Sequence, residues 1–461
     1  MSGYYGEGEE AAAATPTVFS LKSEVASLRN RVKDLEAENA RLSAQISNCR
    51  CKCDKIEEKL DASSVENANG ECNHNPTSNK VNQSRTNSDY DGKSMNHHSR
   101  RYVALKVMYF GQRFYGFSSE AQMDPTVESE IFKALQKTML LIGDKKEIQY
   151  SRCGRTDKGV SAVGQVIALF LRSKLKQSGT NNNTIGRIVE EQQDGEIDYV
   201  RVLNRVLPKD IRIMGWSPVP TDFSARFSCL SREYKYFFWS DNLNILDMET
   251  AGKKFVGEHD FRNFCKMDAV NVHNYIRHII SFEISPFNMS SDGHQLCVIK
   301  FKGTAFLWHQ VRCMVAVLFM IGQGFESPDV IDALLDIDRT PRKPQYLMAP
   351  EIPLVLRSCE FGNLKFTCST DAGQALRVHL ENECRAYHLQ AAIFYEALLS
   401  CLPLSNVTDS DLSGKGILHN GIVKKKVPHV PLMSRPTEPS YEERRTKLES
   451  MKGFAAESTS V

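Results

Sequence analysis

The apolar residues change their spacing along the chain, and each spacing predicts a different kind of structure. Between residues 21 and 46 they recur with the seven-residue period of a coiled coil. Between residues 62 and 100 large apolar residues are almost absent, which is typical of a disordered linker. From Arg101 to Phe361 the periods of strands and amphipathic helices follow one another. We therefore expect a coiled coil, a linker and a folded region, followed by a looser tail.

The heptad segment has the composition of a parallel two-stranded coiled coil. Leucines occupy one core position and mostly β-branched residues the other: Leu21, Leu28, Leu35 and Leu42, and Val25, Val32, Asn39 and Ile46. This combination favours two strands, and a single buried Asn fixes the register. The alternative is a lone amphipathic helix that packs on its own domain. We expect the coiled coil over residues 21–47.

The folded region mixes predicted strands with predicted helices. Residues 103–109 and 231–239 alternate between apolar and polar positions, as half-buried strands do. Residues 166–171 form an unbroken apolar run, which is typical of a buried strand. Apolar stripes at helical spacing predict helices over 127–139 and 306–321. The class is therefore α+β.

Composition excludes several classes of protein. The chain has 461 residues with 41% apolar and 25% charged residues, which is ordinary for a globular protein. The net charge of +2 gives no overall field for nucleic acid, so any basic surface must be local. No apolar run is long enough to span a membrane. Thirteen cysteines without a secretory signal are expected to be thiols, in a protein of the nucleus or cytoplasm.

One carboxylate stands out in the loop before the buried strand. Asp157 lies among Arg152, Arg155 and Lys158 in the segment 151–160. Neighbouring cations favour the ionised carboxylate, so we expect a lowered pKa and a carboxylate suited to act as a nucleophile. The alternative is an exposed turn whose salt bridges contribute little to stability.

Two other elements carry candidate residues. The alternation in 231–239 places Arg232, Tyr234 and Tyr236 on one face, where a guanidinium and two phenols could hold a base and a phosphate. The alternative is a half-buried face with satisfied hydroxyls. Arg312 lies in a predicted core helix and needs a carboxylate partner there, which makes Asp157 a candidate; the alternative is an arginine that reaches the surface.

The order of these motifs resembles a known family. Gly154-Arg155-Thr156-Asp157-x-Gly159-Val160 resembles the catalytic signature of the TruA family of tRNA pseudouridine synthases. Further motifs follow in the family's order: Tyr109-Phe110-Gly111, Phe223-x-Ala225-Arg226-Phe227, Arg232-x-Tyr234-x-Tyr236 and Val311-Arg312-Cys313-Met314-Val315. The segment from Gly257 to Asp268 resembles the eukaryotic branch that modifies uridines 38 and 39 of the tRNA anticodon arm.

The resemblance implies a reaction and roles for four residues. Such enzymes break the bond between uracil and ribose, turn the base and rejoin it through C5, without a cofactor or metal. Asp157 is implied as the nucleophile, at C6 of the base or at C1′ of the ribose. Arg312 would pair with Asp157 and orient it. Tyr234 would stack on the uracil near C5, and Arg155 would replace the flipped base and hold its phosphate.

The resemblance also implies a fold, partners and further contacts. Additional substrate contacts fall on Arg226, Arg232 and Tyr236. The implied pseudouridine synthase fold has two ferredoxin-like, RNP-like halves whose sheets join at a central cleft, here preceded by the coiled coil. The expected partners are the anticodon stem-loop of tRNA and a second copy of the chain. Two alternatives stay open, namely the same chemistry at another RNA position, or an inactive RNA-binding member.

These expectations divide the chain into six segments: a disordered N-terminus (1–20), the coiled coil (21–47), a disordered linker (48–100), an N-terminal catalytic half with the nucleophile loop (101–240), a C-terminal catalytic half (241–361) and a C-terminal extension, partly helical and then flexible (362–461).

Overall fold

The computed structural model of the protein describes residues 30–34, 36–38, 41, 99–119, 123–141, 147–175, 195–291, 294–401 and 428–458. The chain forms two compact units, Met1–Lys93 and Ser94–Val461. In the first unit the described residues are helical and exposed. The predicted N-terminus, most of the heptad segment and nearly all of the linker lie outside the described residues. The coiled coil therefore stays a prediction.

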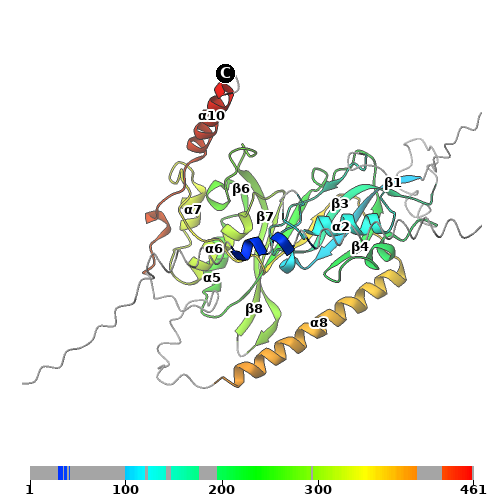
Figure 1. Cartoon of the computed structure of the whole chain (residues 1–461). Coiled ribbons are helices and arrows are strands. Elements are labelled where there is room, and N and C mark those ends of the chain that lie inside the picture. Colours follow the sequence, from blue (N-terminus) through cyan, green and yellow to red (C-terminus); the bar gives the residue numbers. More distant parts are fainter. Residues whose placement is uncertain are drawn as a thin grey trace, which may run out of the picture. The chain divides into compact units, whose positions relative to one another are not determined.

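The second unit is built around one mixed nine-stranded sheet (Figure 1). Its strands are β1 (Arg100–Tyr109), β2 (Ser151–Arg152), β3 (Ser161–Arg172), β4 (Ile211–Pro218), β5 (Ser231–Trp239), β6 (Gly257–Asp260), β7 (Ile276–Ser291), β8 (His294–Gly303) and β9 (Leu354–Glu360). They lie in the order β4-β1-β3-β9-β5-β8-β7-β6, and β2 pairs with β3. The β3–β9 pair is parallel, whereas the other pairs are antiparallel. The late strand β9 thus lies between β3 and β5.

The strands predicted from the apolar pattern are confirmed. The unbroken run from Val166 to Leu171 lies inside β3, where nearly every side chain is buried. β1 pairs with β3 on one side and with β4 on the other, so its central residues are also covered. These strands hold the predicted nucleophile loop, because that loop joins β2 to β3.

Helices α2 (Val127–Lys137), α4 (Tyr199–Asn204), α5 (Ile245–Lys253), α6 (Gln310–Gly322), α7 (Val330–Leu335), α8 (Thr370–Leu399) and α10 (Tyr441–Ser458) accompany the sheet, with short 3-10 turns η1 (Gly111–Arg113), η2 (Arg262–Phe264) and η3 (Leu432–Ser434). α2 begins at a reciprocal cap between Thr126 and Ser129.

α6 begins four residues later than its apolar pattern predicted. The reason is His309, which adopts a left-handed backbone conformation (φ 61°) and stops the helix from extending backwards.

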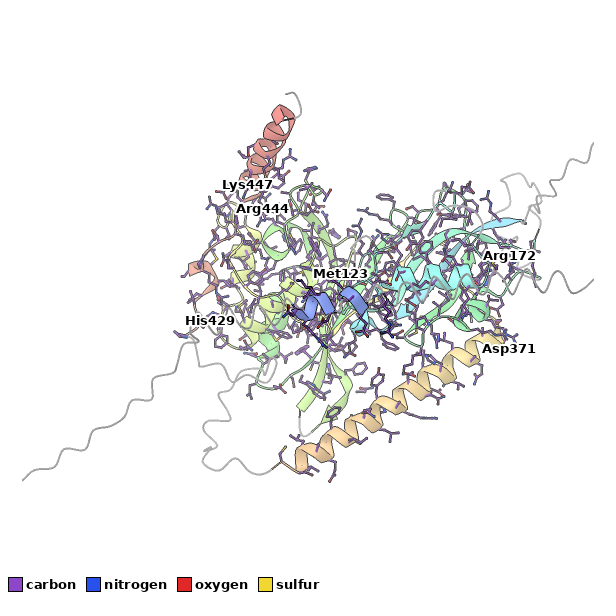
Figure 2. The ribbon with its side chains drawn as sticks, viewed as in Figure 1. Met123, Arg172, Asp371, His429, Arg444 and Lys447 are labelled. Atoms are coloured by element: carbon purple, nitrogen blue, oxygen red, sulfur yellow. The ribbon has the colours of Figure 1, made fainter. Side chains whose placement is uncertain are left out.

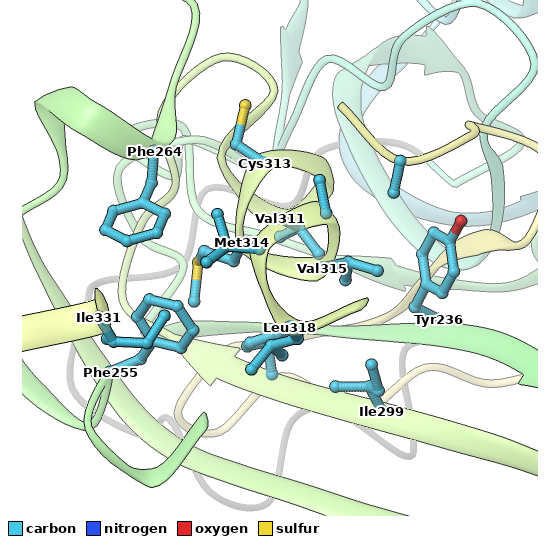
Figure 3. Packing of buried hydrophobic residues seen from close by; sticks show 14 of the residues in the cluster. Tyr236, Phe255, Phe264, Ile299, Val311, Cys313, Met314, Val315, Leu318 and Ile331 are labelled. Carbon is cyan, nitrogen blue, oxygen red and sulfur yellow. The ribbon is translucent and has the colours of Figure 1, made fainter. Parts of the chain in front are cut away.

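Two large hydrophobic clusters cover the sheet. One surrounds α6, whose residues from Gln310 to Leu318 are all buried; Figure 3 shows its packing against Phe255, Phe264 and Ile331. The other joins β1 and β3 to α2 and α4. α6 therefore offers a rigid support to whatever lies at its first turn.

The C-terminal extension contains a long helix and a segment that packs on the fold. α8 is exposed along almost its whole length, with only Ala372 buried. The extension was expected to be partly helical and then flexible; in its segment 428–441, Leu432 is fully buried and His429 Nε2 lies 2.9 Å from Glu326 Oε1. Figure 2 marks His429 in this segment. The His429–Glu326 contact joins positions 103 apart, so no local pattern in the sequence indicated this packing. Among the described residues, no helix is both long and apolar enough to cross a membrane.

Candidate active site

The loop that carries Asp157 is held in place by buried polar side chains. Gln165 of β3 is fully buried and bonds both backbone groups of Gly154: its amide nitrogen donates to the carbonyl (2.9 Å), and its oxygen accepts from the N–H (3.2 Å). Further along the loop, the Thr156 hydroxyl lies 2.7 Å from the Tyr109 hydroxyl of β1. Asp157 is therefore presented by a rigid loop.

A glycine after Asp157 lets the loop turn against a neighbouring segment. Gly159 has a φ of +81°, in the left-handed region that glycine adopts most readily. A Cβ there would lie 2.6 Å from Cγ of Glu351. The geometry thus explains one glycine of the signature and brings Glu351 beside Asp157.

The carboxylate of Asp157 contacts two residues that precede α6. Trp308 donates its indole N–H to Oδ1 at 3.2 Å, and His309 Nε2 lies 3.4 Å from Oδ2. The ammonium group of Lys266 lies 4.3 Å from the centroid of the Trp308 ring. Because the side chain of Asp157 is only 22% exposed, these contacts act in a partly desolvated place.

Burial raises the pKa of Asp157 to about 6. Within this net value, the charge of Arg312, the Trp308 hydrogen bond and the charge of Lys266 lower the pKa, while the charge of Glu351 raises it. The lowered pKa predicted from the sequence is therefore wrong. Two of the cations adjacent in sequence contact other groups: Arg152 forms an ion pair with Glu128 at 2.7 Å, and the ammonium group of Lys158 lies 4.7 Å from the ring centroid of Tyr115.

His309 is the neutral partner in this group. Burial, together with the charges of Arg312, Lys266 and Lys343, lowers its pKa to about 4. At neutral pH the imidazole is uncharged, so it contacts Asp157 as a dipole. Its Nδ1 is buried and has no hydrogen-bond partner among the described residues.

Arg312 acts on Asp157 through its charge. Its Nε donates to the carbonyl of Ala349 at 2.7 Å, and its Nη2 donates to Glu351 at 2.8 Å. The expected direct pair with Asp157 is thus corrected: within the described part of the chain, the carboxylate that Arg312 binds is that of Glu351. The guanidinium still lowers the pKa of Asp157 and partly offsets its burial.

The two tyrosines of β5 occupy different environments. Tyr234 is half-buried, and its ring packs edge-on against Phe306 with centroids 5.0 Å apart. Burial keeps its pKa well above the usual value, and the charge of Asp157 adds to this shift. Tyr236 is only 2% exposed and packs against Phe319 in the cluster around α6 (Figure 3). The predicted substrate contact of Tyr236 is therefore corrected to a core role.

Arg232 connects several backbone segments around the site through hydrogen bonds. Its guanidinium donates to four backbone carbonyls: Thr304 (2.6 Å), Arg226 (2.7 Å), Cys153 (3.3 Å) and Cys229 (3.3 Å). These bonds connect the loop of Asp157 to the turn before β5 and to the end of β8. Since both terminal nitrogens are used within the protein, the predicted substrate contact is corrected to a structural one.

Exposed side chains of the same loop and turn form a basic rim. Arg155, Lys158 and Arg226 are exposed. The guanidinium of Arg226 lies 5.3 Å from the ring centroid of Phe227, which is 82% exposed. The rim thus combines cations with an accessible aromatic ring, a pairing that suits nucleic acid.

Four residues of this site were missed in the sequence: Lys266, Trp308, His309 and Glu351. Their contacts with Asp157 or Arg312 join segments far apart, such as Trp308 and Asp157, which are 151 positions apart. A weak signal was present, because Trp308 and His309 immediately precede the helix of Arg312. An indole N–H and an imidazole beside a core arginine need polar partners.

The buried carboxylate should destabilise the folded chain, so Asp157→Asn is expected to stabilise it at alkaline pH. With a pKa raised from 3.8 to about 6, ionised Asp157 costs about 3 kcal/mol of folding free energy. The cost is absent below about pH 4, grows as the pH rises to 6 and is complete above 6.

Melting temperatures of wild type and Asp157→Asn, compared at pH 4 and pH 8, measure this difference. The melting temperature of the variant should be higher than that of wild type at pH 8 and equal to it at pH 4. Asp371→Asn is the control, because Asp371 is 82% exposed in its side chain. A variant that melts below wild type at pH 8 would contradict the buried-charge explanation.

Comparisons with known proteins identify relatives of this chain. The family model described as tRNA pseudouridine synthase matches residues 251–362. Over 308 residues the chain is 46% identical to the tRNA pseudouridine(38/39) synthase of Bos taurus and 45% identical to that of Homo sapiens, in each case covering 65% of this chain and 64% of the relative. The alignments thus span slightly less than two thirds of these relatives' length.

A relative from Mus musculus aligns over a longer stretch. This tRNA pseudouridine(38/39) synthase is 40% identical over 384 residues, which cover 82% of this chain and 75% of the relative. Identity at this level over most of both chains establishes common descent and a shared fold. The resemblance inferred from the motifs is confirmed, and the chain belongs to the family of tRNA pseudouridine synthases.

Proposed function

We propose that this chain isomerises uridine to pseudouridine in tRNA, at position 38, position 39 or both, with Asp157 as the nucleophile. The observation that carries the proposal is the half-buried carboxylate of Asp157, held by Trp308 beside the charge of Arg312 on a rigid loop with a basic rim. The names of the bovine, human and mouse relatives supply the positions in tRNA.

The environment of Asp157 suits a nucleophile. A pKa of about 6 leaves the carboxylate mostly ionised at neutral pH. Partial burial strips water from its oxygens, which makes an ionised carboxylate more reactive than one in bulk water. The hydrogen bond from Trp308 to Oδ1 orients the group and leaves Oδ2, which lies beside the neutral imidazole of His309, to attack.

Tyr234 is placed to hold the uracil. Its ring is fixed by Phe306, and it stands close enough to Asp157 for that charge to shift its pKa. Flipping a base costs a few kcal/mol, and stacking on an aromatic ring returns about 1–3 kcal/mol. The phenol stays neutral at physiological pH, so it acts by stacking and hydrogen bonding near C5.

The basic rim would hold the backbone of the flipped nucleotide. Arg155 and Lys158 flank Asp157 in the same loop and are exposed, so their cationic groups can meet phosphates. Arg226 and Phe227 extend this rim on the neighbouring turn. Arg155 is proposed to enter the space that the base leaves.

The test is pseudouridine mapping on unmodified tRNA transcripts incubated with the full chain. Transcripts with uridine at 38, at 39 or at both are compared with transcripts that carry cytidine there. Product at 38 or 39 that disappears in the cytidine transcripts is the expected result. Product at another position would keep the chemistry and reject the positions, whereas tRNA binding without product would favour an inactive RNA-binding member.

We infer further that the folded region consists of two ferredoxin-like halves joined at a central cleft. The two large hydrophobic clusters support this division, since one gathers residues of β1, β3 and α2 and the other those around α6. Asp157 comes from the first half, while Trp308 and Arg312 come from the second. A site made by both halves explains why the family motifs are spread along the sequence.

We also propose a homodimer reinforced by the heptad segment. Leucines and β-branched residues at its core positions support this, with Asn39 fixing a parallel register. Deletion of residues 21–46 should lower the dimer fraction in analytical ultracentrifugation. Asn39→Leu is a second probe, because losing the buried Asn relaxes the choice of oligomer. An unchanged mass distribution after the deletion would reject this role.

A further inference from the structure

Three thiols lie together behind the nucleophile loop. Cys153 follows β2 directly, Cys229 precedes β5 by two residues, and Cys359 belongs to β9. Their sulfur atoms all lie within 4.8 Å of one another. The proposed reaction uses none of these thiols, so their convergence from three separate segments calls for another explanation.

The surroundings of the thiols are apolar on most sides. Cys153 and Cys229 are 4% and 8% exposed, and Cys359 is half-buried. The residues packed with them are largely hydrophobic, including Tyr102, Ala104, Val166, Ala168, Ala225, Phe170, Phe223 and Phe361. Such a shell excludes most water, which strengthens any bond that the sulfurs make to a cation.

The spacing fits a metal ion bound by thiolates. With a zinc–sulfur distance of about 2.3 Å, two sulfurs on one tetrahedral ion are about 3.8 Å apart. This separation lies inside the 4.8 Å limit observed here, so small side-chain rotations are sufficient. Thiolates select soft ions such as Zn²⁺.

We propose that Cys153, Cys229 and Cys359 form a structural binding site for a thiophilic metal ion, for which Zn²⁺ is the probe. Three thiolates around Zn²⁺ carry a net charge of −1. Arg232 supplies the balancing charge, because it pairs in register with Cys359 across the sheet and donates to the carbonyls of Cys153 and Cys229.

A metal here would join elements that carry the active site. Cys153 lies four residues before Asp157, and Cys359 lies on the strand that separates β3 from β5. Binding would release the thiol protons to solvent and couple the metal to folding. The ion would stabilise the loop and take no part in the reaction, so this inference is independent of the proposed function.

The experiment counts bound zinc in the full-length chain. The protein is reduced, stripped with a chelator, loaded with Zn²⁺ and desalted, and zinc per chain is measured by mass spectrometry of the metal. Wild type is expected to hold one equivalent more than Cys359→Ser. The control is Cys297→Ser, since Cys297 is a buried thiol (6% exposed) outside this cluster and should keep the wild-type value.

The difference between variants is the readout because Cys49, Cys51 and Cys53 are present in all of them. Zn²⁺ should also raise the melting temperature of wild type and of Cys297→Ser, but not that of Cys359→Ser. If Cys359→Ser fails to fold, Cys229→Ala is the replacement variant, because alanine removes one thiol and keeps its surroundings apolar. Equal zinc in wild type and in a folded cluster variant overturns the proposal, as does wild type that retains none after desalting.

Discussion

Asp157→Asn should abolish pseudouridine formation while leaving tRNA bound. We expect the rate to fall by at least about 10³-fold, because an amide of the same size cannot form the covalent bond that the carboxylate forms. The hydrogen bond from Trp308 can be kept by the amide oxygen, so the loop and the basic rim should stay in place. Single-turnover rates and filter binding on the same anticodon stem-loop separate the two effects.

Two controls sharpen this result. Asp371→Asn makes the same change at an exposed position on α8 and should be as active as wild type. In wild type, activity should be level above pH 6 and fall about tenfold per unit below it, since protonation of Asp157 removes the nucleophile. An Asp157→Asn variant that keeps a tenth of the wild-type rate would reject Asp157 as nucleophile.

Gly164→Ala should destabilise the fold more than any surface change. Gly164 lies in β3 where β9 crosses it, and a Cβ there would overlap the backbone oxygen of Arg357 and lie 2.7 Å from Cα of Ser358. Backbone atoms cannot rotate away as side chains can, so β3 and β9 must separate. We expect a loss of about 3 kcal/mol in the free energy of unfolding.

Thermal unfolding followed by circular dichroism measures this loss, which should appear as a fall in melting temperature of about 5 °C. Gly362→Ala is the matched control, because a Cβ at Gly362 would meet no atom within 4 Å. Equal melting temperatures for the two variants would mean that β3 and β9 adjust freely.

Local patterns predicted the elements that support the site. The apolar run from Val166 to Leu171 identified β3, and the alternation in 231–239 identified β5. The signature around Asp157 marked the loop that joins β2 to β3, where the candidate site lies. These features could be inferred because period and composition are properties of neighbouring residues.

The electrostatics of the site could not be inferred in the same way. Sequence neighbours suggested that cations would control Asp157, but Arg152 turns away to Glu128. Burial has the largest effect on the pKa of Asp157, followed by the opposing charge of Arg312, and both depend on packing between distant segments. The alternation along the strand correctly placed Tyr234 and Tyr236 on the same face of β5. However, only Tyr234 lies beside the site, where it packs on Phe306, whereas Tyr236 is buried in the core.

The place of β9 has a consequence for how the protein is made. Residues 354–360 are synthesised after every other strand of the sheet, and they fill the gap between β3 and β5. On the ribosome, the strands on either side must wait with open edges until these residues emerge. We therefore expect nascent chains shorter than about 360 residues to depend on chaperones. A premature stop codon just before Leu354 should then leave an aggregating product with no partial activity.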